Sequence, residues 1–159
     1  TSSTPSSNSL YVFAPSGSDG LEIVGRVDDF GRNERIQAVR YLENYAYVVT
    51  FERTDPVFAI NLENLKNPVL EGRLRIPGHS YGVWKDGDRV CVSAFEGGLY
   101  LVDAKNPKKP RREKRIPVEG QLWDVVCEGD VAYVAAGTEG LKVVNLQTGE
   151  TKRFTLENP

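Results

Sequence analysis

Apolar and polar residues alternate along most of this chain, and short polar turns interrupt the alternation at regular intervals. The segment 83–92 (VWKDGDRVCV) reappears without a gap as 125–134 (VVCEGDVAYV), and 39–48 (VRYLENYAYV) is a looser copy. Alternation with a period of two is typical of strands that bury one face. A repeat of about 40 residues built from such strands indicates stacked four-stranded sheet units.

Each copy predicts a first strand, a tight turn and a second strand. The turns fall at 43–44, 86–88 and 128–130, where Asn or Gly accepts the backbone conformation of a hairpin turn. Two further strands follow in each unit, and Asn, Asp and Pro residues separate them. The second strands are expected at 45–51, 89–95 and 131–136, the third at 57–61, 99–103 and 141–145, and the fourth at 69–76, 111–116 and 151–156.

An incomplete unit precedes the first full copy. Residues 10–13 (LYVF) match 99–102 (LYLV), and 21–27 matches the fourth strand that carries Gly72-Arg73. We therefore predict an all-β fold of about three and a half four-stranded blades, a partial β-propeller. The predicted blades fill residues 10–159 as a half blade (10–36) and three blades (37–77, 81–117 and 122–156), after a flexible Ser/Thr/Pro-rich lead (1–9).

A partial ring leaves apolar blade faces exposed, because known propellers close with about four to eight blades. Either blades missing from this chain complete the ring, or two chains complete each other as a homodimer. The chain contains no Met, so we expect a processed or excised piece. Its Ser/Thr-rich lead is typical of a stalk before an extracellular domain, or of an end left by domain cutting.

Composition narrows the possible partners. The chain is 40% apolar and 26% charged, as in soluble globular proteins, and its formal charge of −2 gives no general basic field for nucleic acid. The basic run 108–115 (KKPRREKR) is expected on an outer strand, where it protects a sheet edge, and not as a nucleic-acid contact. No apolar run approaches the roughly 20 residues of a membrane span.

The two cysteines fall in different units. Cys91 aligns with Tyr47 and Tyr133 inside a strand, whereas Cys127 aligns with Tyr41 and Lys85 near a turn. A disulfide requires that neighbouring units bring the two residues opposite each other. We expect instead one buried and one half-exposed thiol.

Two stretches resemble known propeller families. Residues 34–41 (ERIQAVRY) and 46–61 (AYVVTFERTDPVFAIN), with Asn67-Pro68 and 75–78 (RIPG), are similar to secreted bacterial and archaeal proteins with a C-terminal β-propeller domain. Residues 132–136 (AYVAA) and 140–145 (GLKVVN) resemble LVIVD-type propeller repeats, although the Leu-Val-Ile-Val-Asp consensus is not kept. Both resemblances imply an exported or surface-attached propeller without an established reaction.

A propeller usually binds ligands on the face shared by the loops before each first strand and after each second strand. Trp123 begins a first strand and can face the channel, whereas Trp84 is expected between blades. Asp55, Glu96 and Glu139 recur at equivalent loops, but their radial divergence favours solvated charges over a cation site. The candidate ligand-binding residues are Arg53, Asp55, His79, Tyr81, Glu96, Trp123, Asp124 and Glu139.

No catalytic residue, metal ligand or cofactor is expected. His79 is the only histidine, and without a placed nucleophile or second ligand it is expected to be a surface or turn residue. The sequence favours a non-catalytic binding or scaffolding module of a secreted or cell-surface protein, with a protein or glycan partner. The alternative is part of an enzyme or of a cofactor- or metal-binding propeller, in which missing blades add residues to His79, Arg53 and Asp124.

Overall fold

A computed structural model of the protein describes residues 6–51 and 55–154, in which fourteen strands and one short 3-10 turn, Gly137–Glu139, form. A two-stranded sheet, here called the half blade, precedes three four-stranded sheets, here called blades 1, 2 and 3. The strands are β1 (Asn8–Ser16) and β2 (Gly20–Phe30) in the half blade; β3 (Arg35–Leu42), β4 (Tyr45–Phe51), β5 (Asp55–Asn61) and β6 (Val69–Ile76) in blade 1; β7 (Ser80–Asp86), β8 (Arg89–Ala94), β9 (Gly98–Asp103) and β10 (Arg111–Ile116) in blade 2; and β11 (Asp124–Glu128), β12 (Val131–Ala135), β13 (Leu141–Asn145) and β14 (Thr151–Phe154) in blade 3.

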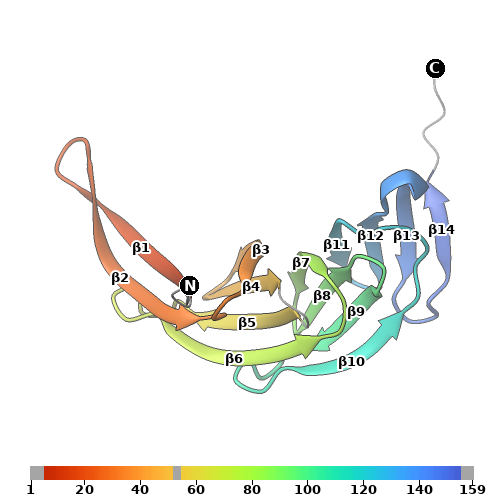
Figure 1. The fold of residues 1–159 in the computed structure, drawn as a ribbon, viewed down its shortest axis with the longest axis horizontal. Helices are drawn as coiled ribbons and strands as arrows, with labels where there is room; N and C mark the ends of the chain where they lie inside the picture. Colours follow the sequence, from red (N-terminus) through yellow and green to blue (C-terminus); the bar gives the residue numbers. More distant parts are fainter. Residues whose placement is uncertain (1–5, 52–54, 155–159) are drawn as a thin grey trace, which may run out of the picture.

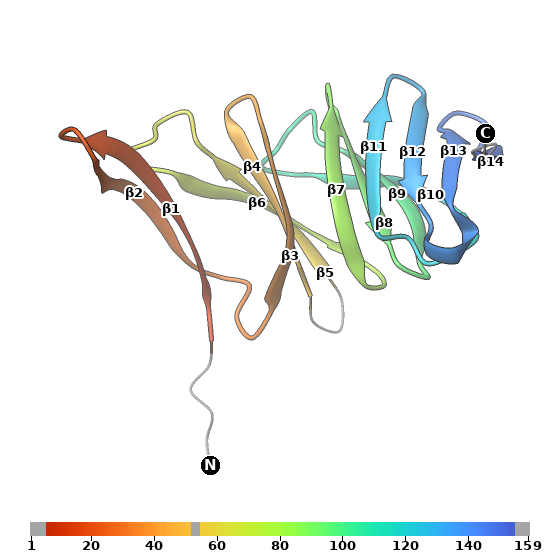
Figure 2. The ribbon, with the colours of Figure 1, turned by 90° about the horizontal axis from the view of Figure 1, so that it is seen from above.

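Each blade is an antiparallel meander in which chain order equals spatial order. The blades follow one another along an open arc, with the half blade at one end and blade 3 at the other (Figure 1). The first strands β3, β7 and β11 lie on its inner side, while β6 and β10 run along the outer side (Figures 1 and 2). The all-β partial propeller predicted from the sequence is confirmed. Among the described residues, no helix has the length and apolar character to span a bilayer.

Three apolar cores lie between successive sheets. In β4, Ala46 and Val48 pack toward the half blade, whereas Tyr47 and Val49 pack toward blade 2. Strict alternation thus gives blade 1 two buried faces, as expected for a strand period of two. The core between blades 2 and 3 contains Leu99, Leu101, Leu122, Val125, Val134 and Val144, and Trp84 packs against it as expected.

A repeated glycine lets the outer strands approach the next blade. A Cβ atom on Gly25 of β2 would lie 2.0 Å from the carbonyl oxygen of Leu65, and one on Gly72 of β6 would lie 1.9 Å from that of Pro107. Leu65 and Pro107 occupy the turns between the third and fourth strands of the following blade. At the third junction Lys114 takes the aligned position, and its ammonium donates to the Leu146 and Gln147 carbonyls at 3.3 and 2.7 Å.

A polar network crosses the outer rim between blades 1 and 2. The Tyr45 hydroxyl donates to Glu71 at 2.8 Å, and Lys108 of blade 2 lies 3.4 Å from the same carboxylate. Burial, together with the Glu71 carboxylate, raises the pKa of Tyr45 to about 12. Burial opposes ionisation of Glu71, but hydrogen bonds from Tyr45 and Asn61 and the charge of Lys108 hold its pKa below the usual value.

Residues 111–115 of the basic run lie on β10, the outer edge strand of blade 2, and residues 108–110 lie in the turn before it. Its cations contact neighbouring groups: Arg111 pairs with Asp103 at 2.9 Å, and Arg115 donates to the Gly97 carbonyl at 2.5 Å. The position of the run on an outer strand is as predicted, and its charges suit an exposed edge.

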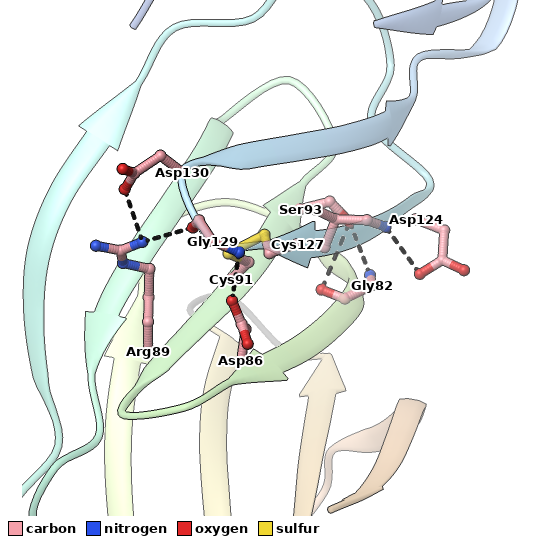
Figure 3. Close-up of a disulfide and its surroundings, with 10 residues drawn as sticks. Gly82, Asp86, Arg89, Cys91, Ser93, Asp124, Cys127, Gly129 and Asp130 are labelled. Carbon is pink, nitrogen blue, oxygen red and sulfur yellow. Dashed lines mark hydrogen bonds and ion pairs between the residues drawn. A yellow bond between two sulfur atoms is a disulfide. The ribbon is translucent and has the colours of Figure 1, made fainter. Parts of the chain in front are cut away.

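The expectation of two separate thiols is wrong, because Cys91 and Cys127 form a disulfide (Figure 3). Cys91 on β8 lies on the face of blade 2 that meets blade 3, and Cys127 on β11 lies on the opposing face. Their Cα atoms are 6.6 Å apart, within the range for a disulfide. Both residues belong to the core between these blades, with exposures of 0% and 3%.

The turns beside the disulfide are also joined. The Gly129 amide donates to the Asp86 carboxylate at 2.7 Å, and the Arg89 guanidinium donates to the Gly129 carbonyl at 3.1 Å (Figure 3). Blades 2 and 3 are therefore held together by a covalent bond in the core and by hydrogen bonds at its rim.

Replacing Gly72 with Ala is expected to lower the free energy of unfolding by about 1–3 kcal/mol, because the new methyl group would stand 1.9 Å from the backbone carbonyl oxygen of Pro107 and force the junction apart. Gly87→Asn is the matched control, since Gly87 has a φ of 53° with open space around it and Asn tolerates this conformation. Urea unfolding of both variants measures the difference. Equal stability of Gly72→Ala and wild type would contradict the tight junction.

Loss of the disulfide is expected to lower the free energy of unfolding by about 2–4 kcal/mol. The bond stabilises the fold because it reduces the conformational entropy of the unfolded chain. Wild type should therefore unfold at lower urea concentration after reduction. The double variant Cys91→Ala/Cys127→Ala should not respond to reductant at all. Detection of two free thiols in the unreduced, denatured wild type would show that the bond is absent.

Candidate binding site on the loop face

The loops before the first strands and after the second strands meet at one face of the arc, here called the loop face. Phe95 and Leu122 form an isolated β-bridge there, in which the Leu122 amide donates to the Phe95 carbonyl at 2.9 Å. This bridge joins the loop after β8 to the loop before β11 and so fixes the junction of blades 2 and 3. A shallow hollow of about 190 Å³ lies beside it, lined by Gly78, His79, Phe95, Glu96 and Gly97.

Three aromatic rings gather at this junction, here called the aromatic cluster: Tyr81, Phe95 and Trp123. The Trp123 ring centroid lies 4.9 Å from that of Tyr81 and 5.1 Å from that of Phe95, and the Tyr81 and Phe95 centroids are 5.4 Å apart. Each such contact contributes about 0.5–1.5 kcal/mol beyond the buried area. The rings support one another, and Trp123 still remains 47% exposed.

Backbone contacts fix the position of Trp123. Its amide donates to the Ala135 carbonyl at 2.8 Å, which ties the residue to β12. Its indole nitrogen lies against Gly137 in the 3-10 turn, 3.4 Å from where a Cβ atom would stand. The exposed tryptophan is therefore held by β12 and by the 3-10 turn, which suits a preformed binding surface.

A charged pair lies on the inner strands next to the cluster. Asp124 of β11 accepts a hydrogen bond from Arg40 of β3 at 3.2 Å, and the Arg40 guanidinium lies 5.7 Å from the Trp84 ring centroid. A Cβ atom on Gly82 would lie 2.6 Å from an Asp124 oxygen, so this glycine permits the close approach of β7 and β11 (Figure 3). Aromatic rings, a cation and a carboxylate are thus available within one surface.

The structure brings together three of the predicted residues, Tyr81, Trp123 and Asp124. His79 lines the hollow beside Phe95, and its ring also packs perpendicular to Phe51 of blade 1 at 4.6 Å. Within the described residues, no hydrogen bond or ion pair connects His79 to Asp124. Glu96 is exposed beside the hollow, and Glu139 forms an ion pair with Lys142 at 3.2 Å. Arg53 and the Asp55 side chain lie outside the described residues.

The described part of the chain contains no group of three or more His, Cys, Asp or Glu side chains placed to hold a metal ion. Two residues of the site were missed from the sequence, Phe95 and Arg40. Phe95 has a signal in the repeat, because it aligns with Phe51 and both rings pack against an aromatic or imidazole ring of the next blade. Arg40 has none, since its partner is 84 residues away on a different blade.

Comparison with known proteins agrees with this architecture. A family model described as a beta propeller domain matches residues 1–81, and a model of the LVIVD repeat matches residues 77–114 and 119–146. The chain therefore belongs to the β-propeller domain family, and its second half carries LVIVD repeats.

Two curated archaeal relatives each align with 73 residues of this chain. An uncharacterised protein of Archaeoglobus fulgidus is 45% identical over 73 residues, and one of Methanocaldococcus jannaschii is 41% identical over 73 residues. Each match covers 46% of this chain and 11% of the relative. The chain therefore aligns with only about a tenth of the length of these relatives.

Solved structures show the same fold. A computationally designed protein, Ika8, superposes with a TM-score of 0.62 at 11% identity, covering 86% of this chain and 40% of the designed chain. A glutaminyl cyclase of Myxococcus xanthus superposes with a TM-score of 0.58 at 18% identity, covering 76% and 50%. At these identities the similarity concerns the fold alone.

The two tryptophans should differ in their access to a neutral quencher. Trp123 stands at the loop face, whereas Trp84 packs against the core between blades 2 and 3. Acrylamide quenching of Trp123→Phe, which retains Trp84, is expected to be severalfold weaker than quenching of Trp84→Phe. Equal quenching constants would contradict the exposed position of Trp123.

Proposed function

We propose that this propeller is a non-catalytic binding or scaffolding module of a secreted or cell-surface protein, and that it contacts a protein or glycan partner through its loop face. The observation that carries the proposal is the aromatic cluster with the exposed ring of Trp123. Tryptophan, tyrosine and arginine are the residue types that dominate binding energy at protein interfaces. An exposed indole also offers an apolar face with a polar edge to a sugar ring.

The rigidity of the surface supports the proposal. Trp123 is held by the Ala135 carbonyl, by Gly137 and by two neighbouring rings, so little side-chain freedom is lost when a partner binds. Smaller ordering costs on binding favour affinity. The pair of Arg40 and Asp124 adds hydrogen-bonding groups that can orient a polar ligand next to the rings.

The Cys91–Cys127 disulfide supports an extracytoplasmic location. Disulfides persist in oxidising environments such as the extracellular space and the periplasm, and they are rare in reducing cytosol. This bond lies in the core between two blades, where it stabilises the part of the fold that presents the aromatic cluster.

The proposal is tested by measuring the affinity of the purified protein for a panel of soluble oligosaccharides. A separate titration uses the surface proteins of cells that express the parent protein. Trp123→Ala is expected to weaken binding at least about 10-fold, as for a central aromatic contact. Tyr41→Ala is the matched control, because its ring is also exposed, at 66%, but lies next to the turn between β3 and β4, at the opposite end of the blade from the loop face. Equal affinity of wild type and Trp123→Ala for every ligand that binds would remove the loop face as the site.

A further inference from the structure

The half blade exposes an apolar face that the other blades bury. Tyr11 and Phe13 of β1 are 44% and 55% exposed, and Leu21 and Ile23 of β2 extend the same face. Tyr11 aligns with Phe58 in blade 1 and Tyr100 in blade 2, which are 2% and 4% exposed because the preceding sheet covers them. The open face of the half blade is thus the side that receives a preceding blade.

Blade 3 exposes the complementary side. Tyr133 is 44% exposed, whereas the aligned Tyr47 is 2% exposed because blade 2 covers it. Leu141 is also exposed, although the aligned Val57 and Leu99 are buried. Val126 and Phe154 complete this apolar face. The open face of blade 3 is the side that receives a following blade.

We propose that a second copy of this chain covers both faces, so that blade 3 of each copy packs on the half blade of the other. The proposal follows from the repeat itself: the two open faces are the two halves of a junction that forms twice between full blades within one chain. Two copies contribute six full blades and two half blades, eight sheets in all, which lies within the four to eight blades of known propellers.

A charged residue at the end of the arc agrees with this assembly. Lys152 of β14 aligns with Lys114 of β10, whose ammonium binds carbonyls in the strand-connecting turn of the next blade. The equivalent turn in the half blade joins β1 to β2 and contains Asp19. Lys152 pairs with Glu150 of its own chain at 3.3 Å, and in the assembly both side chains lie next to that turn of the second copy. Opposite charges at such a rim favour the correct orientation of two partners.

The test measures the mass of the chain in solution by sedimentation at several concentrations. Wild type is expected to be a dimer. Phe13→Glu on the half blade and Tyr133→Glu on blade 3 should each raise the dissociation constant at least about 30-fold, because each places a charge in an apolar interface. Val69→Glu is the control, since Val69 is similarly exposed on the outer strand β6, away from both faces.

Mixing the two variants distinguishes this arrangement from other dimers. Phe13→Glu retains an intact blade 3 face, and Tyr133→Glu retains an intact half blade face, so the mixture should form a heterodimer through one junction. An intact disulfide and an unchanged circular dichroism spectrum show that each variant is folded. The proposal is overturned if wild type is monomeric, as when further blades of a longer chain cover both faces, if either variant dimerises like wild type, or if the mixture stays monomeric.

Discussion

The structure depends on packing sheets face to face, with each full blade between two neighbours sharing both of its faces. Alternation along β4 sends Ala46 and Val48 one way and Tyr47 and Val49 the other, so one strand serves two cores. Each buried aliphatic or aromatic side chain contributes about 1.5–3 kcal/mol. A four-stranded sheet alone has no second layer for these residues. The stability of any blade is therefore inseparable from that of its neighbours.

This constraint also explains where the candidate site lies. Loops at a blade junction are fixed from both sides, and the Phe95–Leu122 bridge shows how one blade anchors the loop of the next. The aromatic cluster takes its rings from β7 and from the loops after β8 and before β11. If the cluster were built on one blade alone, Trp123 would lose its contacts with the Tyr81 and Phe95 rings of blade 2. The disulfide between the same blades strengthens the junction that the cluster requires.

Most of the architecture could be predicted because each repeat carries its own strand pattern and turn residues. The turn sequences and the alternation place β4, β6 and β10 at the residues observed. The disulfide could not be found by aligning repeats, since alignment compares equivalent positions and a junction joins non-equivalent ones. Cys91 lies on the face toward the following blade, and Cys127 on the face toward the preceding blade. Only the spacing of the blades brings them within bonding distance.

The residues of the candidate site also fall into those that the repeat could predict and those that it could not. Trp123 and Tyr81 were found because they occupy aligned positions at or just before the start of a first strand, and Phe95 had a counterpart in Phe51. Arg40 reaches across β7 to Asp124, and that contact depends on Gly82, where the absence of a side chain lets the inner strands approach. Gly25 and Gly72 act likewise on the outer strands, and Lys114 replaces the close backbone approach with a hydrogen-bonded ammonium. The repeat thus specifies the blades, while small departures from it determine how tightly each junction closes and which side chains meet there.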